Sequence, residues 1–250
     1  MTKFNRCFAP NWPAPAKVKA MQTTRLDGLS KAPYTSFNLA MHVADDAAVV
    51  EQNRQLLDIE HPIVWLEQVH GNNCVDLSKL DNFNTVPVAD ASITHKPTQV
   101  CVVMTADCLP VLLTDKNANF VAAVHCGWRG LLQQLLTQVI QSAIAEHAIE
   151  AADILVWFGP AIGKDAFEVG PEVKQAFVEV DKSYAQAFKP SSNQGKFLAD
   201  IFKLASIELN KLNVTEIYSD FECTVTNSDK YFSYRKEGVT GRQASLIWID

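Results

Sequence analysis

The sequence predicts a mixed α/β fold, on three observations. Short runs of apolar and β-branched residues alternate along the chain with stretches of helical periodicity, as in sheets that are covered by helices. Two of these runs, Val111–Thr114 and Phe120–Val124, are close enough to form a hairpin, so the sheet is not expected to be wholly parallel. The composition is that of a globular protein, with 48% hydrophobic residues, 10 Gly and 11 Pro in 250 residues.

Seven segments are expected to be strands, because each is an apolar or β-branched run of strand length. In chain order they are Val18–Thr23, Ile63–Val69, Val100–Met104, Val111–Thr114, Phe120–Val124, Ile154–Phe158 and Leu246–Ile249. Residues 79–98 and 190–196, in which prolines and polar side chains recur, are expected to be loops.

Four segments are expected to be helices, because their apolar residues recur every three or four positions. They are Asp46–Leu57, Leu131–His147, Pro171–Val180 and Phe197–Leu212. Pro171 suits the first position of a helix, where a missing backbone N–H costs nothing. No stretch has the composition of an interdomain linker, so residues 1–250 are expected to form one domain.

Charge and hydropathy exclude two classes of partner. Lys and Arg number 22 against 28 Asp and Glu, and the formal charge of −6 opposes binding to a phosphate backbone. The longest apolar stretch, Val100–Leu113, is interrupted by Asp107 and Pro110 and is too short to span a bilayer. The polar, proline-rich N-terminal segment is not a secretory signal. We therefore expect a cytoplasmic protein that binds neither nucleic acid nor membrane.

The six cysteines, at positions 7, 74, 101, 108, 126 and 223, include no Cys-x-x-Cys pair. This spacing excludes a zinc ribbon and a thioredoxin-type motif. In a reducing cytoplasm the cysteines need no disulfide partners, so their even number carries no information.

Three segments place a histidine or a cysteine where an apolar strand is expected to end. They are Gln68-Val69-His70-Gly71, Thr105-Ala106-Asp107-Cys108-Leu109-Pro110 and His125-Cys126-Gly127-Trp128-Arg129-Gly130. Strand ends are where α/β proteins build sites, so His70, Cys108 and His125 are candidate partners. Two imidazoles and a thiolate suit Zn²⁺, with a fourth position left for water or substrate.

The same residues permit other interpretations. Cys108 and His125 could instead form a nucleophile–base pair, or the histidines and cysteines could be structural. Cys126 competes with Cys108 as the functional thiol, and His42 and His95 compete as ligands.

Two further segments could bind an anion. Gly127-Trp128-Arg129-Gly130 leads into an expected helix, whose first N–H groups and nearby arginine favour negative charge; the alternative is a capping turn with a solvated arginine. Phe232–Arg235 and Gly238–Gln243 form a glycine-punctuated turn that could recognise an anion or stack on a base, or could simply precede the last strand.

In chain order, these and neighbouring motifs resemble the YfiH-like, or laccase-domain, family. The resemblance covers about Asn38 to Trp248. The motifs are Phe37-Asn38-Leu39-Ala40-x-His42-Val43, Asn53-Arg54, Gln68–Gly71, Thr105–Leu113, His125–Gly130, Gly159-Pro160-x-Ile162-Gly163, Phe167–Gly170, Phe232–Arg235 and Gly241–Gln243. One departure is Cys126, which stands where alanine is common in the family.

The resemblance implies a layered α/β sandwich with mixed sheets, similar to that of a bacterial cytotoxic necrotising factor. It implies zinc, or copper as the alternative, held by His70, Cys108 and His125. The implied activity is phosphorolysis of adenosine, inosine and methylthioadenosine, together with adenosine deamination, with purine nucleoside and phosphate as small-molecule substrates. Other roles ascribed to the family are copper-dependent polyphenol oxidation and editing of peptidoglycan precursors.

On this basis we expect three catalytic residues. Cys108 would be a zinc thiolate, Arg129 would bind phosphate, and Asp107 would be a proton shuttle or a structural hydrogen-bond acceptor. The expected substrate-binding residues are Asn38, His42, Arg54, Gln68, Gly127, Trp128, Arg129, Phe232 and Arg235.

Overall fold

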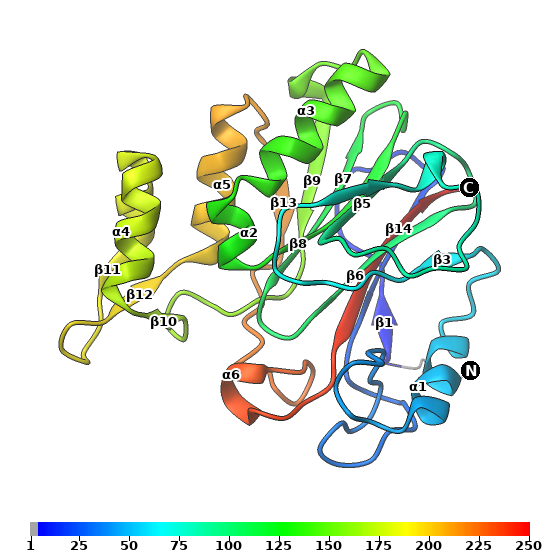
Figure 1. Ribbon diagram of the computed structural model, residues 1–250, viewed down its shortest axis with the longest axis horizontal. Helices are drawn as coiled ribbons and strands as arrows, with labels where there is room; N and C mark the ends of the chain where they lie inside the picture. The colour runs from blue at the N-terminus through cyan, green and yellow to red at the C-terminus, as the bar shows by residue number, and fades with distance from the viewer. Residues whose placement is uncertain (1–4) are drawn as a thin grey trace.

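Two β-sheets that pack face to face form the centre of the molecule (Figure 1). The structure, a computed structural model, describes residues 5–250, so the first four residues of the N-terminal segment lie outside it. The five-stranded sheet has the order β1-β2-β14-β6-β3. Its strands are β1 (Cys7–Phe8), β2 (Val18–Thr23), β14 (Gln243–Ile249), β6 (Val100–Thr105) and β3 (Ile63–Val64). All its neighbours are antiparallel except β3 and β6.

The six-stranded sheet has the order β13-β9-β7-β8-β5-β4. Its strands are β13 (Glu216–Ser219), β9 (Ile154–Phe158), β7 (Leu109–Asp115), β8 (Val121–Cys126), β5 (Ala91–Thr94) and β4 (Cys74–Asp76). The four central strands are antiparallel, whereas β13 and β4 join the edges in parallel. The expected mixed sheet and the β7–β8 hairpin are therefore confirmed.

Helices cover the outer faces of these sheets (Figure 1). They are α1 (Ala47–Gln55), α2 (Trp128–Leu132), α3 (Leu135–His147), α4 (Pro171–Val180), α5 (Ile201–Lys211) and α6 (Tyr234–Glu237), with short 3₁₀ turns at Leu77–Lys79, Ala151–Asp153 and Lys182–Ala187. A small third sheet, in the order β10-β12-β11, lies beside α4; its strands are β10 (Glu168–Val169), β12 (Phe197–Ala199) and β11 (Phe188–Pro190). The expected layered α/β architecture is confirmed.

Side-chain alternation along β8 separates two cores. Ala122, Val124 and Cys126 face the helices and pack with α3 and α5. Val121 and Ala123 face the other sheet. His125 continues this second series, so its ring lies at the end of the space between the sheets.

Four of the differences from the sequence prediction change the type or the extent of an element most. The strand expected at Ile63–Val69 ends at Val64, and residues 65–70 continue as irregular chain. The helix expected at Leu131–His147 is broken, because Gln134 is left-handed at φ 58°. In the expected helix Phe197–Leu212, residues 197–199 pair as β12, and Asp200 caps α5 by accepting from the N–H of Lys203.

The fourth difference is β5, which lies within residues 79–98, expected to be a loop. Its four residues are fully paired and buried, although the sequence around them is polar. Across the described chain, no helix is both long and apolar enough to cross a bilayer.

Candidate metal centre and substrate cavity

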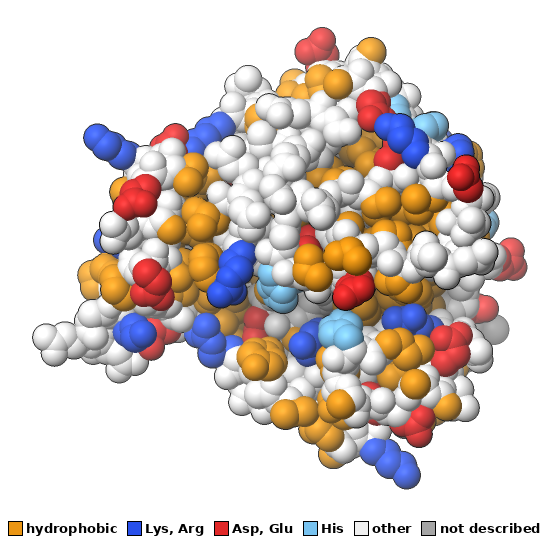
Figure 2. Space-filling view, viewed as in Figure 1, with side chains coloured by type: hydrophobic (Ala, Val, Ile, Leu, Met, Phe, Trp, Pro, Cys, Tyr) orange, Lys and Arg blue, Asp and Glu red, His pale blue; other side chains and the backbone are white. Residues whose placement is uncertain are grey.

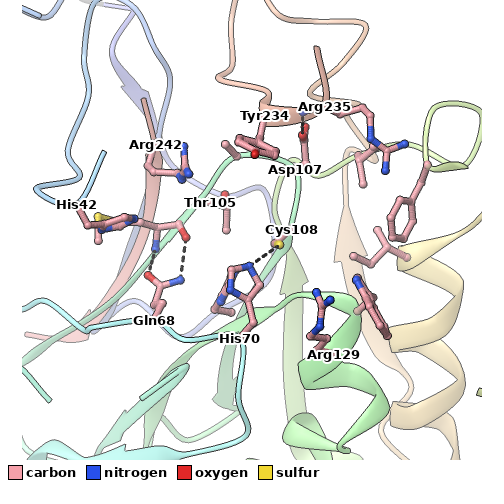
Figure 3. A pocket seen from close by; sticks show the side chains of 17 residues that line it. His42, Gln68, His70, Thr105, Asp107, Cys108, Arg129, Tyr234, Arg235 and Arg242 are labelled. Atoms are coloured by element: carbon pink, nitrogen blue, oxygen red, sulfur yellow. Dashed lines mark hydrogen bonds between the residues drawn. The ribbon is translucent and has the colours of Figure 1, made fainter. Parts of the chain in front are cut away.

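Three segments converge at the end of the space between the sheets. His70 lies in the loop after β3, Cys108 in the turn that carries the chain from β6 to β7, and His125 near the end of β8. Their ligand atoms all lie within 4.8 Å of one another, and Cys108 Sγ is 3.8 Å from His70 Nε2. The residues predicted as metal ligands are therefore neighbours in the fold (Figure 3).

The buried carboxylate of Asp90 orders two of these segments. Its Oδ1 accepts hydrogen bonds from His125 Nδ1 at 2.8 Å and from the backbone N–H of His70 at 2.9 Å. Its Oδ2 accepts from the N–H groups of Gly71 at 2.7 Å and Val69 at 3.2 Å. A carboxylate on Nδ1 fixes the ring and leaves Nε2 as the ligand atom.

The electrostatics of the group favour a thiolate. Burial by itself would raise the pKa of the Cys108 thiol, but the imidazoles of His125 and His70 lower it to about 6. Burial likewise opposes protonation of His125, yet Cys108 and Asp90 raise the pKa of that imidazole above its ordinary value. The thiolate is the form of cysteine that binds metals.

The donor set fits a divalent cation such as zinc. Ligand atoms around one tetrahedral zinc lie about 3.5 Å apart, close to the Cys108–His70 separation of 3.8 Å. Gly127 leaves the necessary space, since a Cβ there would be 3.1 Å from His70 Cδ2 and 3.3 Å from Cys108 Sγ. Among residues 5–250, this is the one such group of three His, Cys, Asp or Glu side chains.

A cavity of about 550 Å³ opens over these three residues. Figure 2 shows the hollow, and the basic side chains that line it are arginines and histidines. The lining residues are His42, Gln68, His70, Met104, Thr105, Ala106, Asp107, Cys108, His125, Trp128, Arg129, Ile162, Phe167, Ile201, Tyr234, Arg235 and Arg242. The chain as a whole carries a net charge of −6, but the side chains that line the cavity include three arginines and only one carboxylate.

The single lining carboxylate is fully used by the protein. Asp107 Oδ1 accepts from Thr224 Oγ1 at 2.6 Å, and its Oδ2 accepts from the backbone N–H of Arg235 at 2.6 Å. It thereby ties the β6–β7 turn to the start of α6. Both of its oxygens therefore already accept a hydrogen bond from the protein.

Of the residues expected to bind substrate, five line the cavity directly. They are His42, Gln68, Trp128, Arg129 and Arg235, while Gly127 lies immediately behind the ligands. The amide of Gln68 is held by the backbone of Met104, donating at 2.9 Å to its C=O and accepting at 2.8 Å from its N–H. The side chain of Gln68 is therefore fixed to β6 and forms part of the cavity wall.

Asn38, Arg54 and Phe232 do not line the cavity. Asn38 Oδ1 accepts from the backbone N–H of Arg242 at 2.9 Å, so Asn38 supports a lining residue from behind. Arg54 donates to the carbonyl of Leu39 at 3.0 Å and stacks on an indole ring. Phe232 is fully buried.

The competing residues also lie apart from the ligand group. Cys126 is buried in the helix-side core, where burial raises the pKa of its thiol well above the ordinary value. His95 packs against His147, with ring centroids 5.3 Å apart. Of the competitors, His42 alone reaches the cavity.

Sequence reasoning missed Asp90 as a site residue and named Arg242 only as part of a turn that could recognise an anion. Asp90 lies in a segment expected to be a loop, and its one sequence signal is its place directly before the short run Ala91–Thr94. Arg242 belonged to the glycine-punctuated turn Gly238–Gln243 that could recognise an anion, but it was not among the residues expected to bind substrate. Only the fold brings these two side chains to the centre.

The fold and the site together define a layered α/β protein with a His–Cys–His centre in a cation-lined cavity. The chain belongs to the family described as multi-copper polyphenol oxidoreductase laccase, whose model matches residues 19–250.

Several relatives cover almost the whole chain. A Pseudomonas aeruginosa protein named purine nucleoside phosphorylase is 44% identical over 98% of this chain and 99% of its own length. The Escherichia coli purine nucleoside phosphorylase YfiH is 42% identical, with the same coverage of each chain. A solved DUF152 protein from Neisseria meningitidis has a TM-score of 0.91 and 41% identity, over 98% of this chain and 99% of that one.

Proposed function

We propose that this protein is a zinc-dependent purine nucleoside phosphorylase acting on adenosine, inosine and methylthioadenosine. The observation that carries the proposal is one cavity that joins the His70–Cys108–His125 group to three arginines and an aromatic wall. The names of relatives that are 44% and 42% identical over the full chain support it.

Phosphorolysis sets two demands that this cavity can meet. An oxygen of hydrogen phosphate forms a bond to C1′ of the ribose while the bond from C1′ to the purine nitrogen breaks. The electron pair of the broken bond goes to the purine, which takes up the proton that hydrogen phosphate gives up. The protein must therefore hold an anion and a flat heterocycle on either side of the ribose.

The protein's own residues supply orientation and charge. His70, Cys108 and His125 would hold the zinc, with Asp90 orienting His125 and Gly127 leaving room. When bound, zinc supplies a Lewis acid that polarises a substrate oxygen or activates water.

The remaining lining residues would bind the substrates. Trp128 and Phe167 offer faces for a purine, and cations lie at both ends of the cavity (Figure 3). Asp107 is best used as a structural hydrogen-bond acceptor rather than as a proton shuttle, because both of its oxygens are already occupied.

Adenosine deamination is proposed as a second activity of the same centre. It needs an activated water beside the purine, and the metal ligands border the wall that would hold the base.

The family description favours one other candidate, copper-dependent oxidation of phenols. Met104 lines the cavity and is the residue type that blue-copper sites use as a weak axial ligand. Against it, multicopper chemistry needs several copper sites, and the part of the chain that the structure describes gathers one three-ligand group. Editing of a cell-wall precursor would use this same cavity, and the muropeptide composition of a deletion strain would test it.

The deciding experiment combines metal analysis of the untreated protein with a nucleoside panel. We expect about one zinc per chain, and release of adenine from adenosine only when phosphate is present. Omission of phosphate separates phosphorolysis from hydrolysis, and inosine formation reports deamination. If zinc-replete protein releases no base, and copper-loaded protein consumes oxygen with a phenol, the proposal is wrong.

A further inference from the structure

Thr105 lines the cavity, and its buried hydroxyl has no hydrogen-bond partner among the described residues of the protein. Thr105 is the last residue of β6, its side chain is 2% exposed, and Oγ1 has no hydrogen-bond partner. In Figure 3 it lies between Arg242 and Cys108. A buried hydroxyl without a partner costs stability, so its retention beside a cavity suggests that a ligand supplies the missing bond.

Arg242 lies on the same side and forms no direct ion pair within the described chain, although the charges of Cys108 and Asp107 act on its guanidinium. Its Nη1 donates to the carbonyls of Thr240 at 2.9 Å and Gly241 at 3.0 Å, and it forms no ion pair with any carboxylate of residues 5–250. Burial lowers the pKa of this guanidinium, which shows that its charge is partly withdrawn from water. Such a cation attracts an anion.

His42 completes this side of the cavity (Figure 3). Burial first, and then the charges of Arg242 and Arg54, lower the pKa of its imidazole, so the ring is neutral near pH 7. A neutral imidazole donates one hydrogen bond and accepts another. It therefore suits hydrogen phosphate, which has both oxygen acceptors and an O–H donor.

The opposite side of the centre has a different character. Arg129 lies over the ring of Trp128 at 4.3 Å, and Arg235 lies over Phe167 at 5.7 Å. Arg235 also donates to the carbonyl of Ala166 at 3.0 Å. These cations are stacked on aromatic rings, and the surfaces beside them suit a flat purine.

We propose that Thr105, Arg242 and His42 form the phosphate subsite, and that the purine lies against Trp128 and Phe167. This inference rests on the proposed function and moves phosphate away from Arg129, where the sequence placed it. It puts the ribose between the two ends of the cavity, over His70, Cys108 and His125 (Figure 3).

The test measures binding of inorganic phosphate to the zinc-loaded protein by calorimetry, beside KM values for phosphate and inosine. We expect Thr105→Val to weaken phosphate binding about tenfold and Arg242→Gln about 100-fold, with the KM for inosine unchanged. Arg129→Gln should leave phosphate affinity unchanged. Thr105→Val should melt no lower than the wild type, because it removes an unpartnered hydroxyl.

The matched control is Ser92→Ala, which removes another buried, unpartnered hydroxyl that does not line the cavity. It should change neither phosphate affinity nor KM. The inference is overturned if Thr105→Val and Arg242→Gln both keep wild-type phosphate affinity, if Arg129→Gln alone loses it, or if the wild type binds adenosine 5′-monophosphate but not inorganic phosphate.

The two levels of the proposal fail separately. If phosphate binds in a manner that depends on Thr105 and Arg242 but no nucleoside releases its base, the subsite stands and the proposed function is wrong. If nucleosides are cleaved with phosphate but neither substitution changes its binding or its KM, the function stands and this subsite is wrong.

Discussion

Cys108 and Cys126 lie at the same end of the β7–β8 hairpin but in opposite environments. In the register of the two strands Leu109 pairs with Cys126, so Cys108 stands just beyond the pair. The thiol of Cys108 lies beside two imidazoles, which lower its pKa to about 6 against the effect of burial. The thiol of Cys126 lies in an apolar core, where burial raises its pKa well above the ordinary value.

The difference shows that the face of the sheet, more than the strand end, determines chemistry here. His125 and Cys126 are adjacent in sequence, yet strand alternation sends one to the inter-sheet space and the other to the helix side. The two faces of the six-stranded sheet should therefore respond independently to substitution.

The largest expected effect is that of removing the thiol of Cys108, which faces the metal centre. Cys108→Ser should reduce zinc from about one per chain to a small fraction and abolish turnover, because it removes the thiolate of the group. Elemental analysis and nucleoside cleavage measure this. Cys126→Ala is the matched control and should keep its zinc. Full zinc in Cys108→Ser, or its loss in Cys126→Ala, would reverse the assignment of the two cysteines.

Asp90→Asn should have the next largest effect, which should again be confined to the metal centre. The carboxylate accepts hydrogen bonds from His125 Nδ1 and from three backbone N–H groups. An amide has only one oxygen and cannot accept all four. We expect zinc affinity to fall about 10- to 100-fold in a chelator competition.

Asp107→Asn serves as the control for Asp90→Asn. It lies in the same cavity but ties the β6–β7 turn to α6 instead of orienting a ligand. Its zinc affinity should stay within about threefold of the wild type. Equal losses in the two variants would mean that Asp90 acts through general stability.

Gly127→Ala should also reduce zinc affinity, but by less. Its φ of −66° suits any residue, so the effect comes from the new Cβ, which would crowd His70 Cδ2 and Cys108 Sγ. Because these atoms need to shift by only a few tenths of an ångström, zinc affinity should fall about three- to tenfold. Gly130→Ala, whose nearest contact would be a carbonyl oxygen of Gly71 at 3.2 Å, provides the comparison. An unchanged affinity in Gly127→Ala would show that the centre has room to spare.

A substitution of Glu208 should change stability through the helix-side core and leave the metal centre unchanged. It is buried on α5, its Oε1 accepts from the N–H of Thr137 at 2.8 Å, and burial raises the pKa of its carboxyl to about 7. Because the folded-state pKa is raised, the stabilising contribution is complete below about pH 4.5 and is lost as the pH rises through 7.

Glu208→Gln should therefore match the wild type near pH 5 and be more stable at pH 8, by on the order of 1–3 kcal/mol. Urea unfolding at the two pH values measures this, and zinc content should not change. If the advantage is the same at both pH values, the carboxyl does not titrate in this window.

The local sequence pattern was sufficient to predict the bounds of an element when the residues within that element determine them. β2, β9 and α4 have the bounds that the sequence predicted, since alternation, a β-branched run and Pro171 at the first helical position act within each segment. Pairing between strands overrode the local helical pattern elsewhere. Residues 197–199 have helical periodicity, but pairing with the earlier strand β10 and with β11 across a short hairpin makes them β12.

The sequence by itself determined the layered α/β class, the family and the three candidate ligands, because each depends on residue types in short, ordered motifs. Only the tertiary structure decided that Asp90 supports His125, that Asn38 supports Arg242 from behind, and that the cations divide between two ends of one cavity. The physical reason is range. Periodicity acts over a few residues, whereas these contacts join segments that meet only when the two sheets pack.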